Sequence, residues 1–211
     1  MGISIVGAGN VGLALGRRFV AQNIHVTFAV RNPNDSKYLP LKNEFQNKAH
    51  FTTTEKLPLK SDFTFLAVPW TSVPEVTKKL PYTKGQVICD CTNPLTRDLK
   101  GLQHHDGLSG AEKVASLLPG ATVLKAFNHT GASNIENPTF EKGTPLLFVA
   151  GEHQDSKNDL IKLIDKIGFR GVDAGELSAS MHLENLALFW IHMAYKTKVG
   201  PNHSLGLLEK F

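Results

Sequence analysis

The run Ile3-Ser4-Ile5-Val6-Gly7-Ala8-Gly9-Asn10-Val11-Gly12 decides the fold of this chain. An apolar stretch typical of a β-strand leads into a G-x-G-x-x-G turn, and a helical pattern follows it. Gly7 allows the tight turn, Gly9 leaves space for a phosphate, and Gly12 lets the helix pack closely on the strands. The unpaired N–H groups and the dipole of the helix start attract phosphate. The run therefore predicts a dinucleotide site, and a phosphate-free glycine turn in another α/β fold is the alternative.

A second strand is predicted over residues 25–31, and it ends on Arg31. At this position a carboxylate accepts hydrogen bonds from the ribose 2′-hydroxyl of NAD, whereas a guanidinium pairs with the 2′-phosphate of NADP. Asp35 is the only nearby acid, and it lies beyond the strand end, in the loop. The sequence thus predicts NADP(H) as the cofactor. The alternative is that Arg31 is an ordinary solvated charge.

Composition excludes several classes of function. The chain has 211 residues and a formal net charge of +4, and its lysines form no basic stripe interleaved with aromatic residues, so we expect no nucleic-acid partner. The apolar stretch 186–195 is interrupted by His192 and is too short for a bilayer. The first residues enter a strand directly, without a signal peptide. With Cys89 and Cys91 expected to be reduced, these features predict a cytoplasmic protein.

Strands and helices are expected to alternate along the chain. Further strands are predicted at 49–52, 62–68, 86–91, 122–127, 145–150 and 171–173. Two sequences have the form of a capping box, one with Ser72 and Glu75 and the other with Ser109 and Glu112. A helix over 154–167 is expected to be capped by Asp155 and ended by Gly168, and a last helix is expected over 177–195.

This alternation predicts an α/β protein with a doubly wound, mostly parallel sheet (a Rossmann fold) and a short C-terminal helical extension. We expect residues 1–175 to form the NADP-binding domain and residues 176–211 to form the helix and tail. The last helix is apolar on more than one face. One face should pack on the sheet domain, and the other predicts the contact of a homodimer.

Ligands bind at the carboxyl ends of the strands in such sheets, so the residues that follow each strand are candidates for the site. Pro69 and Trp70 should border the nicotinamide, although they could instead only close the core. Asn93, followed by Pro94, can hydrogen-bond a ribose or carboxamide, or it can be a turn signal alone. His129 is the only imidazole expected near the reacting ring, and a hydrogen-bonded loop histidine is the alternative.

A metal site is not expected. His104, His105 and Asp106 resemble a metal-binding cluster, but they lie in a polar loop without a matched partner, which favours a solvated loop. Little chain follows Gly175, and no Ser-x-x-x-Lys pair follows a strand. The second reactant, a small-molecule hydride acceptor, should therefore bind on the cofactor domain itself. A second subunit is the one further part of the protein expected to complete this site.

Six segments of the sequence, taken together, form a pattern that is specific for one family. They are Gly7–Gly12, Val30-Arg31-Asn32, Ala67-Val68-Pro69-Trp70, Asp90–Leu95, Lys125-Ala126-Phe127-Asn128 and Val172–Gly175. They resemble, in order and over nearly the whole chain, the NADPH-dependent coenzyme F-420 reductase family. The oxidoreductase domain of membrane-bound metalloreductases is similar too. The resemblance implies a Rossmann domain with a small helical extension, commonly dimeric, that moves hydride between NADPH and a 5-deazaflavin.

The resemblance also implies roles for individual residues. The pyrophosphate would be held by Gly7, Ala8, Gly9, Asn10 and Val11. The 2′-phosphate would be held by Arg31 and Asn32, and the nicotinamide half would be lined by Val68, Pro69 and Trp70.

Hydride transfer to a flavin-like ring needs orientation and exclusion of water more than it needs acid catalysis. We therefore expect an NADP(H)-dependent oxidoreductase without an indispensable general acid. Two alternatives stay open. One is a non-catalytic NADPH-sensing regulatory protein. The other is a small imine or ketone reductase, which would use a proton donor such as His129.

Overall fold

The computed structural model describes residues 1–103 and 106–210. Its main sheet has six strands in the order β3-β2-β1-β4-β5-β6, and all neighbouring strands are parallel. The strands are β1 (Gly2–Val6), β2 (His25–Ala29), β3 (Ala49–Thr52), β4 (Phe63–Leu66), β5 (Val87–Asp90) and β6 (Thr122–Lys125). The order switches between β1 and β4, and ligands bind at the carboxyl ends of strands at such a switch. The predicted doubly wound Rossmann fold is confirmed.

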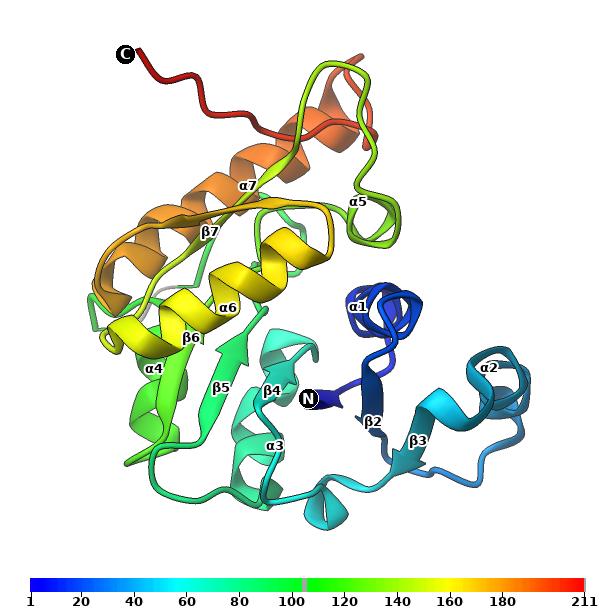
Figure 1. Ribbon diagram of the computed structural model, residues 1–211. Coiled ribbons are helices and arrows are strands. Elements are labelled where there is room, and N and C mark those ends of the chain that lie inside the picture. The colour runs from blue at the N-terminus through cyan, green and yellow to red at the C-terminus, as the bar shows by residue number, and fades with distance from the viewer. Residues whose placement is uncertain (104–105, 211) are drawn as a thin grey trace.

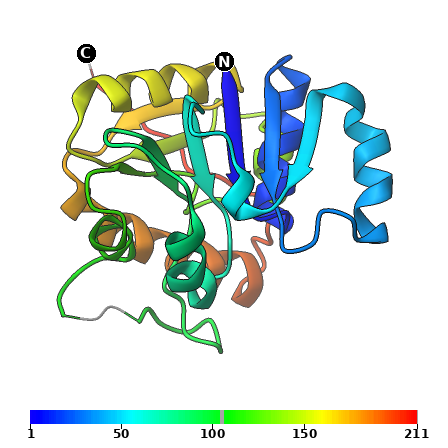
Figure 2. The same ribbon diagram turned by 90° about the horizontal axis from the view of Figure 1, so that it is seen from below.

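Helices cover both faces of this sheet (Figure 1). They are α1 (Asn10–Ala21), α2 (Leu39–Phe45), α3 (Val73–Lys79), α4 (Gly110–Leu117), α5 (Ala132–Glu136), α6 (Gln154–Lys166) and α7 (Ser180–Lys196). Seen from below, α6 lies on one side of the strands, and α3 and α4 lie on the other (Figure 2). The central strand β4 is therefore buried at every position, on both of its faces.

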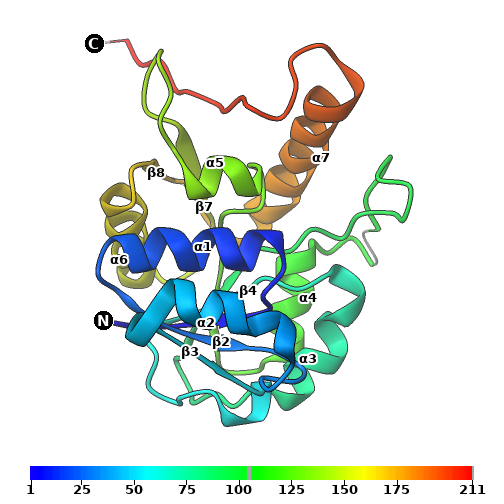
Figure 3. The same ribbon diagram turned by 90° about the vertical axis from the view of Figure 1, so that its right-hand side faces the viewer.

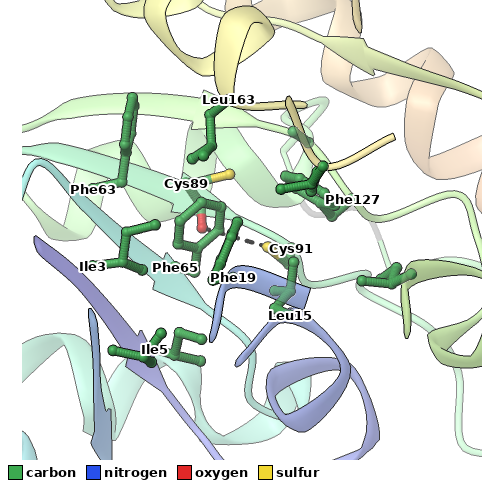
Figure 4. Close-up of a cluster of buried hydrophobic side chains, with 14 of the residues drawn as sticks. Ile3, Ile5, Leu15, Phe19, Phe63, Phe65, Cys89, Cys91, Phe127 and Leu163 are labelled. Carbon is green, nitrogen blue, oxygen red and sulfur yellow. Dashed lines mark hydrogen bonds between the residues drawn. The ribbon is translucent and has the colours of Figure 1, made fainter. Parts of the chain in front are cut away.

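Two hydrophobic cores form because successive strand residues point to opposite faces. In β4, Phe65 belongs to the core that α1 and α6 cover, and Leu66 belongs to the core that α3 and α4 cover. Figure 4 shows the first core, where Phe19 of α1 lies against Phe65 with ring centroids 5.1 Å apart. Phe127, beyond β6, meets the same ring edge-on at 5.7 Å. These aromatic contacts fix α1, and with it the glycine turn, against the middle of the sheet.

The last two strands differ from the prediction, because they do not extend the main sheet. β7 (Leu146–Val149) and β8 (Arg170–Asp173) form a separate two-stranded parallel sheet. An antiparallel bridge between Lys125 and Ala150, with N–O distances of 2.8 and 3.0 Å, joins it to β6. The chain runs against the direction of β6 there, so the parallel ladder cannot continue.

Of the two predicted capping boxes, the structure contains one. Ser109 and Glu112 form a complete one at the start of α4. The one predicted for Ser72 and Glu75 is wrong: Ser72 has helical backbone angles and its side chain makes no capping bond. A 3₁₀ turn, η4 (Trp70–Ser72), already enters the helix there, so Ser72 cannot take the extended conformation of a cap.

The start and end of α6 give one correction and one confirmation. The cap residue is His153 rather than the predicted Asp155, which lies within the first turn. An acidic side chain still stabilises the helix dipole from that position. Gly168 follows the helix with φ +94°, a conformation that favours glycine, and it ends α6 as predicted.

The C-terminal extension is the helix α7 followed by a tail that passes the loop between α5 and β7 (Figure 3). Every third or fourth residue of α7 faces the rest of the molecule: Leu183, Ala187, Trp190 and Ala194 are buried. The carbonyl oxygen of His203 accepts hydrogen bonds from Trp190 Nε1 (3.1 Å) and from Asn134 Nδ2 (2.8 Å). Main-chain bonding of Leu146 to Leu205 then attaches the tail to β7.

Candidate functional site

A cleft of about 290 Å³ opens at the carboxyl ends of β1, β2 and β4. The predicted residues that line it are Gly7, Ala8, Gly9, Arg31, Val68 and Pro69. Asn10, Val11 and Asn32 are neighbours of these residues along the chain but are not among the lining residues. The cleft therefore joins the glycine turn, the end of β2 and the loop after β4, as the strand order requires.

The three glycines of the turn differ in whether the fold leaves room for a side chain. Gly7 has φ +107°, and a Cβ there would lie 2.4 Å from the carbonyl oxygen of Ala67. A Cβ on Gly12 would lie 2.1 Å from the carbonyl oxygen of Gly7. Gly9, by contrast, is exposed and has open space where a Cβ would be. Gly7 and Gly12 are thus required by the fold, while the protein itself leaves Gly9 unconstrained.

The start of α1 fits a phosphate. Gly9 is its N-cap, and among the described residues no side chain caps the helix. Its first N–H groups and its positive dipole end therefore point toward the cleft beside a glycine that has no side chain to block an anion. This geometry supports the predicted place of the pyrophosphate.

Arg31 lines the cleft together with Lys37, one of the polar residues 32–37 that the sequence places around the same ribose, and with Tyr38, which it does not indicate; both belong to the 3₁₀ turn η1 (Ser36–Tyr38). The ammonium of Lys37 lies 5.1 Å from the centre of the Tyr38 ring. Two cations at the end of β2 suit a phosphate. The sequence signal for the short turn that carries Lys37 is the Asp35-Ser36-Lys37 run, in which Asp35 can cap the turn.

Asp35 does not compete for the ribose. Its Oδ1 accepts a hydrogen bond from the main-chain N–H of Lys37 at 3.0 Å, and its Oδ2 lies 3.1 Å from the ammonium of the same residue. These hydrogen bonds, first of all the one from the main-chain N–H, lower the pKa of Asp35. The carboxylate is therefore engaged in capping η1, and it is absent from the residues that line the cleft.

Trp70 and Pro94 lie together beyond the cleft. A Cβ built on Gly110 would be 3.2 Å from Cδ of Pro94 and 3.3 Å from the Trp70 ring. Trp70 also lines a small hollow with Ser109 and Gly110. The loops after β4 and β5 thus form one wall at the N-terminus of α4, here called the Trp70–Pro94 wall.

Asn93 and Asn128 pair across the ends of β5 and β6. Asn93 Nδ2 donates to the carbonyl oxygen of Asn128 at 2.8 Å, and Asn128 Nδ2 donates to Asn93 Oδ1 at 2.9 Å. Asn128 Nδ2 also donates to the carbonyl oxygen of Leu183 at 3.0 Å. Within the described part of the chain, the buried Oδ1 of Asn128 has no hydrogen-bond partner. An acceptor is thus left at this edge of the sheet, beside the predicted nicotinamide end.

His129 is buried and has a structural partner. Its Nε2 accepts a hydrogen bond from the main-chain N–H of Phe148 at 3.1 Å. Burial lowers the pKa of His129 to about 4. The imidazole is therefore neutral near pH 7 and holds β7, and it is not among the residues that line the cleft.

The sequence analysis missed a buried charged cluster of Asp90, Lys125 and Glu184, whose side chains are all fully buried. The ammonium of Lys125 lies 2.8 Å from Asp90 Oδ2 and 2.8 Å from Glu184 Oε1. Burial by itself lowers the pKa of Lys125, but the two carboxylates outweigh it and the pKa is raised. The available signal was two opposite charges at the ends of adjacent apolar strands.

Within residues 1–103 and 106–210, no group of three or more His, Cys, Asp or Glu side chains is suited to a metal ion. His104 and His105, which resemble a metal-binding cluster on paper, lie outside the described residues. Over the same two ranges, no helix combines the length and the apolar character needed to cross a membrane.

Comparison with known proteins supports the sequence resemblance. Residues 2–94 match the family described as NADP oxidoreductase, coenzyme F420-dependent. The matched region contains the glycine turn, Arg31 and the strand ends up to Pro94. The predicted resemblance is therefore confirmed over this region. The match also supports the predicted cofactor, NADP(H).

Among curated proteins, metalloreductase STEAP3 of Rattus norvegicus is 26% identical over 209 residues, which cover 99% of this chain and 40% of that protein. Metalloreductase STEAP2 of Mus musculus is 24% identical and covers 88% of this chain and 36% of that protein. The chain thus spans about two fifths of the length of the curated relatives it matches.

Solved structures share the fold. A hypothetical protein from Sinorhizobium meliloti is 27% identical, with a TM-score of 0.78 over 100% of this chain and 96% of that one. A candidate F420-dependent NADP reductase from Arthrobacter sp. FB24 is 20% identical, with a TM-score of 0.84 over 98% and 99% of the two chains. An imine reductase of Streptomyces aurantiacus is 18% identical, with a TM-score of 0.64 over 92% and 63%.

Proposed function

Starting from the match of residues 2–94 to the coenzyme F420-dependent NADP oxidoreductases, we propose that the protein transfers hydride between NADPH and a deazaflavin- or flavin-like acceptor bound in the same cleft. The observation that carries the proposal is the cleft itself. Its walls join the glycine turn, Arg31 and the Val68-Pro69 loop. Both ends of a dinucleotide can then be held on one rigid sheet edge.

The residues of the chain divide the cofactor between them. The pyrophosphate is assigned to Gly7, Ala8, Gly9 and the N–H groups of Asn10 and Val11. The 2′-phosphate is assigned to Arg31 and Asn32, with Lys37 beside them. The nicotinamide half is assigned to Val68, Pro69 and Trp70 on one side and to Asn93 and Pro94 on the other. These last two follow β5, the neighbour of β4 in the sheet.

When bound, the nicotinamide supplies the hydride. The protein orients the two rings and excludes water from them, and both effects lower the barrier without an acid or base. The neutral, buried His129 agrees with this proposal, because an imidazole with a pKa of about 4 is not in the acidic imidazolium form near pH 7. An imine or ketone reductase would need a proton donor.

The test is oxidation of NADPH in the presence of separate acceptors: deazaflavins, flavins, quinones, imines and ferric chelates. We expect the parent protein to reduce the deazaflavin or flavin, and the variant Gly9→Ala to do so with a KM for NADPH raised about tenfold. A matched control is Gly2→Ala, because a Cβ there also meets open space but lies at the far end of β1. Reduction of imines alone would overturn the acceptor class. Tight NADPH binding without any oxidation would support the regulatory alternative.

Ferric chelates are the second class of acceptor because of one observation. The metalloreductase relative aligns with nearly the whole of this chain. A ferric ion takes one electron and a hydride carries two, so each NADPH would reduce two ferric ions through a carrier, such as a flavin, that accepts the hydride and passes the electrons on singly. Ferric chelates should therefore be reduced when a flavin is added to the assay and not when NADPH and the protein are present alone.

We infer a homodimer from the outer face of α7. A groove of about 450 Å³ there is lined by Leu99 and, on the helix, by Leu188, Phe189, His192 and Tyr195. Phe189 and Tyr195 are 55% and 64% exposed. Asp98 and Lys196 border the same groove. A two-fold copy can therefore bury the apolar side chains and place unlike charges opposite each other.

We also propose a reducing, cytoplasmic setting, on the basis of the cysteines. Cys89 and Cys91 are both free and buried. Burial raises the pKa of the Cys89 thiol well above its usual value, which makes it unreactive. Reduced, packed thiols are typical of a reducing compartment.

A further inference from the structure

The fully buried cluster of Asp90, Lys125 and Glu184 has no part in the proposed reaction as described so far. Burial of three charged side chains is unfavourable unless each is paired and hydrogen-bonded. All three donors of the Lys125 ammonium are engaged. They bond to Asp90 Oδ2 (2.8 Å), Glu184 Oε1 (2.8 Å) and the carbonyl oxygen of Thr92 (2.6 Å). The third bond holds the main chain directly before Asn93 and Pro94.

The carboxylates extend the cluster to two other elements. Asp90 Oδ1 accepts from the main-chain N–H of Thr92 at 2.9 Å and from its hydroxyl at 2.7 Å. Glu184 accepts from the main-chain N–H groups of Gly110 (3.0 Å) and Ala111 (3.3 Å) at the start of α4. The cluster thus connects the ends of β5 and β6, the loop after β5, the start of α4 and the helix α7.

The Trp70–Pro94 wall rests directly on this cluster. A Cβ on Gly110 would lie 2.9 Å from Glu184 Oε1, 3.2 Å from Pro94 and 3.3 Å from the Trp70 ring. A side chain at position 110 therefore has no room between Glu184 and the wall. A second connection runs in parallel, because Asn128 bonds both Asn93 and the carbonyl oxygen of Leu183, the residue before Glu184.

We propose that Lys125 is a positioning residue for hydride transfer: through Thr92 and Glu184 it fixes the Trp70–Pro94 wall against which the nicotinamide half is held. This inference rests on the proposed function for the identity of the bound ring. The cluster itself does not touch the cleft and supplies no proton. Its short bonds hold together the loop after β5, the start of α4 and the helix α7, and their loss would let the wall shift.

The test variant is the triple substitution Asp90→Asn, Lys125→Met and Glu184→Gln. It keeps the shapes and removes all three charges together, so no unpaired charge stays buried. The background is Trp190→Phe, which leaves Trp70 as the only one of the two tryptophans. Quenching of Trp70 emission by acrylamide reports the wall without cofactor, and energy transfer from Trp70 to bound NADPH reports it with cofactor.

We expect the triple variant to show greater quenching of Trp70 and altered energy transfer. Its dissociation constant for NADPH should change less than about threefold, since the phosphates are held elsewhere, and kcat should fall about tenfold or more. Unchanged Trp70 quenching, energy transfer and kcat in a folded triple variant would overturn the proposal.

A second variant keeps the test decisive if the triple variant does not fold. Gly110→Ala changes no charge and pushes a methyl group between Glu184 and the Trp70–Pro94 wall, so it should alter the same three readouts. Gly206→Ala is its control, because a Cβ there meets nothing within 4 Å. If the parent does not bind NADPH, the proposed function fails, whereas the quenching of Trp70 still decides whether the cluster holds the wall.

Discussion

Asn93 and Asn128, which lie 35 residues apart in the chain, exchange two hydrogen bonds across the ends of β5 and β6. The sequence predicts Asn93 as a ligand for the cofactor, and the structure shows that its side chain already has a protein partner. The pair fixes the direction in which each amide points. Any hydrogen bond from Asn93 to a ribose or carboxamide would therefore come from an oriented group and would cost little side-chain entropy.

Arg31 should determine the preference for NADPH over NADH. Substitution Arg31→Ala removes a charge-assisted contact to the 2′-phosphate, so the dissociation constant for NADPH should rise roughly 10- to 100-fold. The constant for NADH should change little. Titration of the fluorescence of each reduced nucleotide measures both constants. Arg97→Ala removes an exposed arginine elsewhere and should leave both unchanged. If Arg31→Ala weakened the binding of NADPH and of NADH equally, the assignment of the 2′-phosphate to Arg31 would be wrong.

Gly9 and Gly12 should respond differently to the same substitution. Gly12→Ala places a Cβ 2.1 Å from the carbonyl oxygen of Gly7, so the free energy of unfolding should fall by about 3 kcal/mol. Gly9→Ala meets open space, so its stability should change by less than about 0.5 kcal/mol while NADPH binding weakens about tenfold. Urea unfolding and NADPH titration separate the two effects. Normal NADPH binding in Gly9→Ala would contradict the proposed path of the pyrophosphate.

His129 should make the protein less stable in acid. Its pKa is about 4 in the folded protein and near 6.5 when unfolded, so between these values only the unfolded chain binds the proton. Its contribution to stability is complete above about pH 6.5 and is lost as the pH falls, by about 3 kcal/mol between pH 7 and pH 4. His129→Gln should remove this part of the loss in urea unfolding at a series of pH values.

The control for that series is His50→Gln, an exposed position where the acid-dependent loss should persist. The same His129→Gln protein also tests the mechanism. It should retain hydride transfer, since no acid is required. Complete loss of activity with normal NADPH binding would show that the imidazole takes part in the reaction.

The outer face of α7 should control assembly. Phe189→Glu puts a charge into the apolar groove and should convert the dimer into a monomer at micromolar concentrations, as measured by sedimentation or light scattering. Leu59→Glu is a matched control, since Leu59 is 49% exposed but lies away from the groove. A parent protein that is already monomeric at these concentrations would refute the homodimer.

Local sequence patterns predicted the elements that form the first half of the site. The G-x-G-x-x-G turn, the strand before it and Arg31 are close together in the chain, and steric rules fix their arrangement. The capping box at Ser109 was equally local and is confirmed. The box at Ser72 failed because the loop after β4 already enters a 3₁₀ turn, a conformation that the spacing of Ser72 and Glu75 does not encode.

The sequence by itself determined the class of fold, the position of the glycine turn and the cation at the end of β2, because each depends on contacts between near neighbours. Only the tertiary structure decided the environment of His129, the separate β7–β8 sheet and the cluster of Asp90, Lys125 and Glu184. These features join residues that lie 19 to 94 positions apart. Their charge states and partners depend on burial, which no local pattern specifies.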